Sequence, residues 1–324
     1  MTRTLNILRI SPSPHVKDSM TTQRVMLCVI LALVPSVISA GYYFGFRAIM
    51  LIAFCILSCV LLEGVTRIIM KREQTIGDMS AVLTGLLLAL NLPVTLPFWQ
   101  ALIGCFVAIV VVKQLFGGLG QNFANPAIVG RIVLMLSFTS NMTTWALPKY
   151  YNTLKDSDTF VTIGSSKILT GATPLVTGDA SYKDLFLGNV GGCIGETCAL
   201  ALLIGGIYLI IRGIISPVTP VAFIGTVALL DLIAGNDVIY NMLAGGLFLG
   251  AFFMATDYVT TPITNKGKLI FGIGCGLITF IIRQFGSYPE GVSFSILLMN
   301  IITPYIDRFT MTKPFGAKKE VKQK

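Results

Sequence analysis

The sequence is poor in charged residues. Only 12% of its 324 residues are Asp, Glu, Lys or Arg, whereas a soluble globular protein has about 25%. Hydrophobic residues make up 54%, and the mean hydropathy is +0.79. Apolar runs of about 20 residues, the length that crosses about 30 Å of hydrocarbon, recur along the chain. These features exclude a soluble protein and predict a polytopic, all-α integral membrane protein.

Residues that bind metals and haem are scarce as well. The chain has one histidine, His15, so a haem held by two histidines inside the membrane is excluded. Its seven cysteines lie in apolar segments without any C-x-x-C pair, and such cysteines usually serve packing. Cys193 and Cys198 stay open as ligands. No Walker loop, dinucleotide fingerprint or zinc spacing occurs, so neither a metal site nor a catalytic residue is predicted.

The hydropathy pattern predicts a single membrane domain, 1–324. It has a cytoplasmic N-terminal segment (1–24), an extracytoplasmic loop (140–185) and a basic cytoplasmic tail (308–324). The first apolar run begins at Val25 and is longer than the apolar core of a signal peptide, so it is expected to remain as the first helix. The chain should contain about ten transmembrane segments, roughly 25–45, 48–69, 76–92, 97–115, 123–139, 186–211, 217–235, 238–256, 268–285 and 290–307.

Lysines and arginines set the expected orientation, because cytoplasmic loops are enriched in them. With the N-terminus inside, 18 of the 24 fall on the cytoplasmic side. The six on the outer side are Arg47, Lys149, Lys155, Lys167, Lys183 and Arg283. Both termini are therefore predicted to be cytoplasmic. The formal charge of +9 is an orientation signal, and no nucleic-acid partner is predicted.

The two halves of the chain resemble each other at matching positions. Because the match is displaced by five segments, an odd number, the halves should have opposite orientations, as in the inverted repeats of transporters. We therefore expect two inverted repeats of five helices, some of them broken. The matched stretches are Asp78-Met79-Ser80-Ala81 with Asn241-Met242-Leu243-Ala244, Val94-Thr95-Leu96-Pro97 with Val259-Thr260-Thr261-Pro262, and Lys113-Gln114-Leu115-Phe116-Gly117 with Arg283-Gln284-Phe285-Gly286.

Glycine-rich joints and isolated charges indicate where the working centre lies. Residues 117–126 and 188–196 are rich in glycine, and non-helical backbone at membrane depth is tolerated only where protein buries it or it lines a cavity. Charges inside apolar segments usually pair or line a polar path. The candidates for an ion path are Glu196, Asp257 and Lys113, drawn from the set Glu63, Lys113, Arg131, Glu196, Asp231, Asp257 and Arg283.

One short motif lies in the long polar loop, Thr170-Gly171-Ala172-Thr173. Pro174 follows it and disfavours a helical conformation at Thr173, which is therefore expected to be extended. Gly171 and Ala172 carry almost no side chain. The pattern predicts an accessible hydroxyl that another enzyme can modify, although an ordinary turn-rich loop has the same composition.

Over essentially its full length the chain resembles the RnfD component of the Rnf ion-translocating electron-transport complex, of the NqrB/RnfD family. It is also similar to the more distant NqrB component of the sodium-pumping NADH:quinone reductase. The stretches that carry the resemblance are Ser11-Pro12-Ser13-Pro14-His15, Arg24-Val25-Met26-Leu27, Asn122-Phe123-Ala124-Asn125-Pro126-Ala127, Thr170-Gly171-Ala172-Thr173-Pro174-Leu175 and the run from Gly195-Glu196-Thr197-Cys198 to Gly205-Gly206.

The resemblance implies a covalent flavin. In that family the last Thr of the motif, here Thr173, holds FMN by a phosphoester bond that a flavin transferase makes from FAD outside the membrane. The transferase's broader pattern has Asp where Lys167 stands here. Lys167 or Lys183 is expected to help neutralise the phosphate. Non-covalent riboflavin is a further expected cofactor, without an identified site.

The resemblance also implies function and location. The chain would carry electrons in an Rnf complex together with the other Rnf subunits (A, B, C, E and G), coupling ferredoxin-to-NAD electron transfer to Na⁺ or H⁺ translocation across the inner membrane of a prokaryote. The flavin itself would carry the electrons. Two other interpretations stay open, a secondary transporter and a scaffold component without its own ion path. The sequence does not choose between Na⁺ and H⁺.

Overall fold

The computed structural model describes residues 20–148, 159–163, 166–171, 173–178, 180–286 and 291–311. The predictions on His15 and the rest of the N-terminal segment before Met20, on Ala172 and on the tail beyond Met311 lie outside these residues. Within them the chain is mainly helical, which confirms the predicted all-α membrane architecture. Three helices are long and apolar enough to cross a membrane, Thr22–Phe44, Phe46–Ile69 and Asn265–Phe285.

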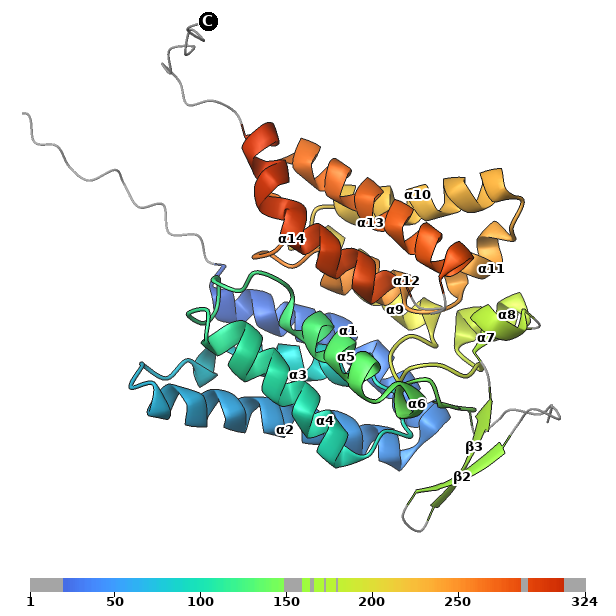
Figure 1. Ribbon diagram of the computed structural model, residues 1–324, viewed down its shortest axis with the longest axis horizontal. Coiled ribbons are helices and arrows are strands. Elements are labelled where there is room, and N and C mark those ends of the chain that lie inside the picture. Colours follow the sequence, from blue (N-terminus) through green and yellow to red (C-terminus); the bar gives the residue numbers. More distant parts are fainter. Residues whose placement is uncertain are drawn as a thin grey trace, which may run out of the picture.

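The first half of the chain forms one helical bundle, drawn from blue to green in Figure 1. Thr21 caps its first helix by accepting a hydrogen bond from the backbone N–H of Arg24, which satisfies one of the free donors at the helix start. The elements of this N-terminal bundle are α1 (Thr22–Phe44), α2 (Phe46–Ile69), the short 3₁₀-helix η1 (Ile76–Asp78), α3 (Ser80–Leu90), α4 (Phe98–Phe106), the π-helix η2 (Val107–Gln114) and α5 (Pro126–Ser137).

The second half forms a C-terminal bundle, drawn from yellow to red, which packs on the first (Figure 1). Its elements are α9 (Ala199–Ile211), α10 (Val218–Ala234), α11 (Val238–Leu243), α12 (Leu247–Leu249), the π-helix η3 (Gly250–Met254), α13 (Asn265–Phe285) and α14 (Val292–Thr310).

The equivalent helices α1 and α9 run in opposite directions. The hydroxyl of Ser36 donates to the carbonyl of Gly195, before α9 begins. Farther back along α1, the backbone of Ala32 lies so close to Gly205 that a Cβ there would overlap its carbonyl oxygen. Earlier still, Val25 shares a pocket with Leu209. Positions descending along α1 thus meet positions ascending along α9, as inverted repeats require.

Several segments are broken helices, as the glycine-rich joints predicted. At 1.5 Å per residue, the 11 residues of α3 span about 16 Å, half of the bilayer core. The chain then unwinds over 91–97 and meets a second unwound stretch, 188–198. There Ile194 N–H donates to Leu92 (3.0 Å) and Gly195 N–H to Leu90 (2.8 Å).

Two predicted segments contain breaks. The segment 186–211 opens with the predicted glycine-rich joint, and residues 188–198 use their backbone groups to contact the end of α3, so α9 begins only at Ala199. The segment 238–256 is interrupted at 244–246, where Gly245 has a positive φ of 72°. This conformation is easy for glycine and costly for other residues.

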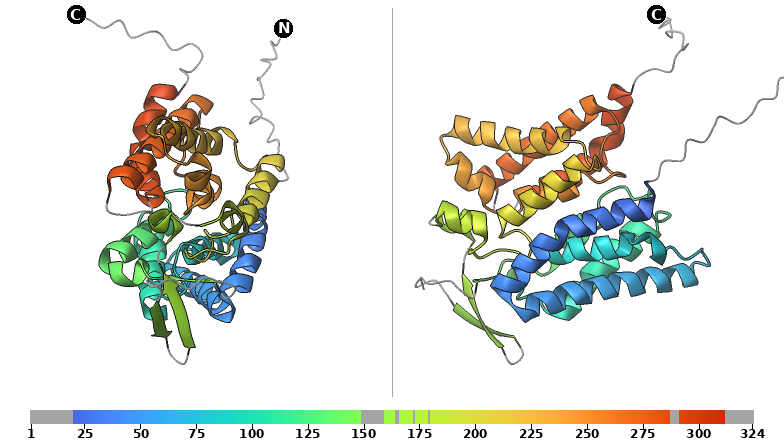
Figure 2. Two further views of the ribbon diagram at one scale, coloured as in Figure 1. Left: turned by 90° about the vertical axis from the view of Figure 1, so that its right-hand side faces the viewer. Right: turned by 180° about the vertical axis from the view of Figure 1, so that it is seen from behind.

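The long loop carries structure that the sequence did not predict. Its β-strands form a small antiparallel sheet in the order β1-β3-β2. The sheet lies at the end of the molecule opposite the start of α1 and the end of α14 (Figure 2); we call that end the sheet face. The loop elements are α6 (Thr139–Met142), β1 (Trp145–Ala146), β2 (Thr159–Ile163), β3 (Ser166–Gly171), α7 (Pro174–Thr177) and α8 (Tyr182–Leu187).

Candidate functional site

Thr173 lies between the small sheet and α7. Strand β3 ends at Gly171, which pairs with Trp145, while Thr170 pairs with Ala146 on one side and with a residue of β2 on the other. The backbone of Thr173 has φ −69° and ψ 156°. The extended conformation predicted from Pro174 is therefore confirmed, and the sheet fixes where the motif leaves the strand.

The side chain of Thr173 is not accessible in this structure, contrary to what the small neighbours in the motif suggested. It is only 3% exposed and lines a narrow pocket of about 10 Å³, which we call the tether pocket. This volume holds about one water molecule. The other residues of the tether pocket are Pro174, Leu175, Leu185, Val190, Gly191, Gly192, Glu196, Thr197, Leu243 and Gly245.

The tether pocket brings together two residues that the sequence singled out separately, Thr173 and Glu196. Among its described lining residues, Glu196 is the sole charged side chain. Lys183, expected to neutralise a phosphate, lies exposed on α8 and does not line the pocket. The side chain of Lys167 lies outside the described residues. The pocket next to Thr173 is therefore acidic in its own lining.

A tyrosine ties down residues 174–180, which we call the tether segment, next to Thr173. The hydroxyl of Tyr240, on α11, donates a hydrogen bond to the carbonyl of Pro174 (2.8 Å) and accepts one from the backbone N–H of Ala180 (3.4 Å). These contacts join both ends of residues 174–180 to the C-terminal bundle. We call this pair of contacts the Tyr240 latch.

Glu196 is paired with a buried arginine. Arg131, on α5, places NH1 2.8 Å from Oε1 of Glu196, and both residues are 3% exposed. The charge count included Arg131 among the cytoplasmic charges, whereas in the structure its side chain is buried between the two bundles. Breaking such a pair by removing one partner usually costs about 3–5 kcal/mol.

Arg131 also joins the broken ends of several segments. Its NH1 donates to Oδ1 of Asn91 at the end of α3 (2.7 Å) and to Oγ of Ser293 at the start of α14 (3.1 Å). Its NH2 donates to Sγ of Cys193 (3.6 Å). Cys193 thus serves here as a hydrogen-bond acceptor, and the described part of the chain holds no group of three metal-binding side chains.

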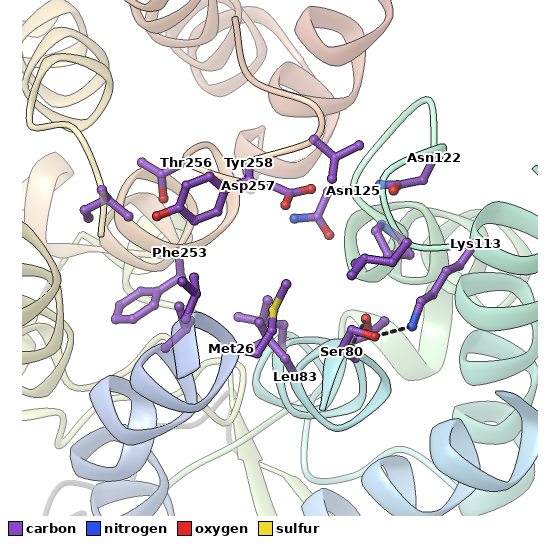
Figure 3. Close-up of a pocket in the computed structure, with 18 of the residues that line it drawn as sticks. Met26, Ser80, Leu83, Lys113, Asn122, Asn125, Phe253, Thr256, Asp257 and Tyr258 are labelled. Carbon is purple, nitrogen blue, oxygen red and sulfur yellow. Dashed lines mark hydrogen bonds between the residues drawn. The ribbon is translucent and has the colours of Figure 1, made fainter. Parts of the chain in front are cut away.

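The other two candidates for the ion path meet in a different pocket. Lys113 and Asp257 line a cavity of about 80 Å³ that we call the α1–η3 pocket (Figure 3). Its walls are mostly apolar, from Met26 and Leu83 to Phe253, and amides of Asn122 and Asn125 converge on it. It begins next to Val25, so it lies toward the end of the molecule where α1 starts.

Lys113 is part of a buried network around Glu63. Its Nζ lies 2.9 Å from Oε2 of Glu63 and 2.7 Å from Oγ of Ser80. The other carboxylate oxygen accepts from Nε2 of Gln114 (2.9 Å) and from Oγ1 of Thr75 (3.0 Å). The π-helix η2 turns both Lys113 and Gln114 toward Glu63, and π-helical turns are frequent at functional sites.

Buried polar groups lie between the two pockets. Asn91, which accepts from Arg131, places Nδ2 3.5 Å from Sδ of Met254. The backbone carbonyl of Met254 lies 3.4 Å from Nδ2 of Asn125, which lines the α1–η3 pocket. Glu196 is thus separated from Lys113 and Asp257, yet both pockets border the same interface between the bundles.

Sequence reasoning missed the contributions of Arg131, Thr197 and the glycines at 191 and 192. Arg131 was visible as a charge in an apolar segment, but its partner is 65 positions away and cannot be read from local spacing. The two glycines had been noted as a joint. Their proximity to Thr173 depends on the unwound course of residues 188–198.

Comparisons with known proteins place the chain in a family. Residues 9–316 match the family described as "NQR2, RnfD, RnfE family". The chain is 47% identical to the D component of the Na(+)-translocating ferredoxin:NAD(+) oxidoreductase complex of Acetobacterium woodii, over 98% of both chains. It is 43% identical to the D component of the proton-translocating ferredoxin:NAD(+) oxidoreductase complex of Clostridium ljungdahlii, over 97% of this chain and 98% of the relative.

A third relative is the D component of the ion-translocating oxidoreductase complex of Pectobacterium atrosepticum. It is 36% identical, and the match covers 95% of this chain and 98% of the relative. Similarity of this extent spans both helical bundles and the long loop between them. The chain therefore belongs to the NQR2, RnfD, RnfE family.

Proposed function

We propose that this chain is the flavin-carrying membrane component of an Rnf-type complex, which couples electron transfer between ferredoxin and NAD to Na⁺ or H⁺ translocation. The names of its relatives support this function, since they describe the D component of such complexes. Its partners would be the other Rnf subunits (A, B, C, E and G). The site would lie in the inner membrane of a prokaryote, with the sheet face outside and both termini in the cytoplasm.

The cofactor would be FMN on Thr173. The hydroxyl oxygen of Thr173 would form a bond to phosphorus of FAD, AMP would leave, and the hydroxyl proton would be released, which yields a phosphoester. The flavin supplies the electron-carrying chemistry. The observation that supports this most directly is the placement of Thr173 at a fixed, extended position beside the glycine-rich stretch 188–198, at the end of the molecule that the charge pattern puts outside.

The flavin ring needs more room than the tether pocket offers. A larger pocket of about 370 Å³ shares Leu175 with it and is lined also by Tyr240, Phe280 and Arg283. Leu175, Tyr240 and Phe280 give this outer pocket an apolar and aromatic side against which a flavin ring would pack, whereas the rest of its lining is polar and includes Asp231, Asp237 and Arg283. Residues 174–180 would guide the ring toward it from Thr173.

The chemistry of the α1–η3 pocket's lining would suit a second, non-covalent flavin such as riboflavin, for which the cavity would have to widen. Phe253 and the aliphatic residues supply apolar walls, while Asn122, Asn125 and Lys113 supply donors (Figure 3). An uncharged, planar, amphipathic ligand matches that lining. Riboflavin fits better than FMN, since Asp257 also lines the pocket and would repel a phosphate.

Ion translocation would use charged groups at the two pockets. Glu196 lies at the tether pocket, whereas Asp257 and Lys113 lie at the α1–η3 pocket. The identity of the ion is open, because two relatives with 47% and 43% identity are named for Na⁺ and for protons. In the assembled complex, Glu196→Gln should abolish ion translocation while electron transfer continues. Unchanged translocation would support a scaffold role for the chain.

Mass mapping of the peptide around Thr173 tests the central proposal. Protein produced together with a flavin transferase should fluoresce in a denaturing gel and gain the mass of FMN less water. Thr173→Ala should lose both signals, whereas the control Thr177→Ala in the same loop should keep them. Flavin that persists in Thr173→Ala would refute the assignment. Solute uptake by flavin-free protein in vesicles would instead favour a secondary transporter, which broken inverted repeats also fit.

A further inference from the structure

The tether pocket contains a buried hydroxyl without a partner among the described residues. Thr197 lines the pocket, is 4% exposed, and its Oγ1 makes no hydrogen bond to any of them. Leaving a buried polar group unsatisfied is costly, about 1–3 kcal/mol. Such a group in a pocket beside a modification site indicates that its partner is a ligand.

Backbone donors lie on the same wall of the pocket. Gly191 and Gly192 both line it, and no hydrogen bond from their N–H groups is found in the described part of the chain. Thr197 lies two residues before α9, which begins at Ala199. The first N–H groups of a helix have no partner within it, and the positive end of its dipole favours anions. The wall thus contains one hydroxyl and two backbone N–H groups for which the described residues supply no partner.

The negative charge on this wall is already compensated. Glu196 alone would repel an anion, but Arg131 lies 2.8 Å from its carboxylate and is buried with it. Because this ion pair is neutral overall, a pocket lined by a hydroxyl and backbone N–H groups beside it can accept a phosphate. The same glutamate without its arginine could not, because two anions would then share a desolvated space.

We propose that Thr197, Gly191 and Gly192, which precede α9, form an anion seat for the phosphate of the flavin tethered at Thr173. Arg131 is a positioning residue of this seat, because it cancels the charge of Glu196. The inference rests on the proposed flavin function and adds to it the residues that hold the phosphate. Since the closed pocket holds about one water, residues 173–180 must move outward to admit the phosphate, and the ring lies outside the seat.

The test uses the full chain produced without flavin transferase, so that Thr173 is unmodified. The protein is titrated with FMN in excess riboflavin, which occupies any site that needs no phosphate, and binding is followed by fluorescence anisotropy. We expect specific FMN binding in the presence of riboflavin. Thr197→Val, which keeps the shape and removes the hydroxyl, should weaken it at least about tenfold, equivalent to about 1.4 kcal/mol. Thr197→Ser should retain it.

A second variant should change the affinity for FMN in the opposite direction. Glu196→Gln leaves Arg131 uncompensated, so FMN should bind more tightly than to the unaltered chain. The anion seat is refuted if riboflavin fully displaces FMN, if Thr197→Val and Thr197→Ser bind alike, or if Glu196→Gln weakens binding.

These results are separable from the proposed function. Covalent FMN on Thr173 without phosphate-dependent binding would overturn the anion seat alone. Absence of covalent flavin from protein produced with the transferase would overturn the proposed function itself.

Discussion

Replacing Tyr240 with phenylalanine should speed the attachment of flavin. Thr173 is 3% exposed in the closed structure, so a transferase can reach it only after residues 174–180 move away. The Tyr240 latch contributes two hydrogen bonds to the closed state. At about 0.5–1.5 kcal/mol each, their loss shifts the opening equilibrium by about 1–3 kcal/mol. At about 1.36 kcal/mol per decade, the open population rises about fivefold to 150-fold.

The measurement is a time course of covalent flavin incorporation. Purified, unmodified chain is mixed with FAD and a limiting amount of transferase, and samples are denatured and read by in-gel fluorescence. While opening limits the reaction, the initial rate follows the open population and should rise at least about fivefold in Tyr240→Phe. The final extent of modification should not change, because Thr173 itself is intact.

Tyr258→Phe is the matched control. Its hydroxyl also donates to a backbone carbonyl, that of Ile214, but it lines the α1–η3 pocket, far from the tether segment. Its rate should equal that of the unaltered chain. Equal rates for Tyr240→Phe and the unaltered chain would refute the idea that the latch limits access. A rise in both variants would point to general loosening of the fold.

Other substitutions test the packing and the buried network. Gly205→Ala should lower the melting temperature in detergent, because a Cβ there overlaps the carbonyl of Ala32 and overpacking costs about 1–3 kcal/mol. Gly225→Ala meets nothing within 4 Å and should be neutral or stabilising, so equal effects of the two would contradict the close α1–α9 contact. Glu63→Gln leaves Lys113 buried without its anion and should destabilise by about 3–5 kcal/mol. Adding Lys113→Met should recover part of this loss, and no recovery would show that the two charges are not coupled.

The sequence predicted what depends on local pattern. Long apolar runs defined α1, α2 and α13 to within a few residues, because a transmembrane helix satisfies its own backbone and needs only length and hydropathy. Pro174 predicted the extended backbone of Thr173, since the steric effect of a proline acts on its immediate neighbour. Repeated motifs predicted two similar halves.

What depends on contacts distant in sequence could not be predicted. Residues 188–198 are apolar enough to resemble a helix, yet their N–H groups donate to the end of α3, and no local signal encodes that pairing. Arg131 was counted with the cytoplasmic charges and its burial was missed, because a charge count has no information on its partner Glu196. The sheet β1-β3-β2 was missed because its strands are short and flank a loop without clear alternation.

Matched positions in the two halves of the chain make different contacts in the structure. Lys113 and Arg283 occupy matched positions, but Lys113 pairs with Glu63, whereas Arg283 donates to the carbonyls of Asn241 (2.7 Å) and Ala244 (3.2 Å). Arg283 thereby fixes the break between α11 and α12.

That break forms part of the tether pocket. A Cβ at Gly246 would lie 2.8 Å from Oε1 of Glu196, and one at Gly245 would lie 2.8 Å from Leu175. Lys113 thus stabilises the buried carboxylate of Glu63. Its counterpart Arg283 instead fixes the backbone against which Glu196 and Leu175 pack. Divergence of the partners around matched cations therefore gives the two pockets different surroundings, with the buried Lys113–Glu63 pair at one and the broken α11–α12 backbone at the other.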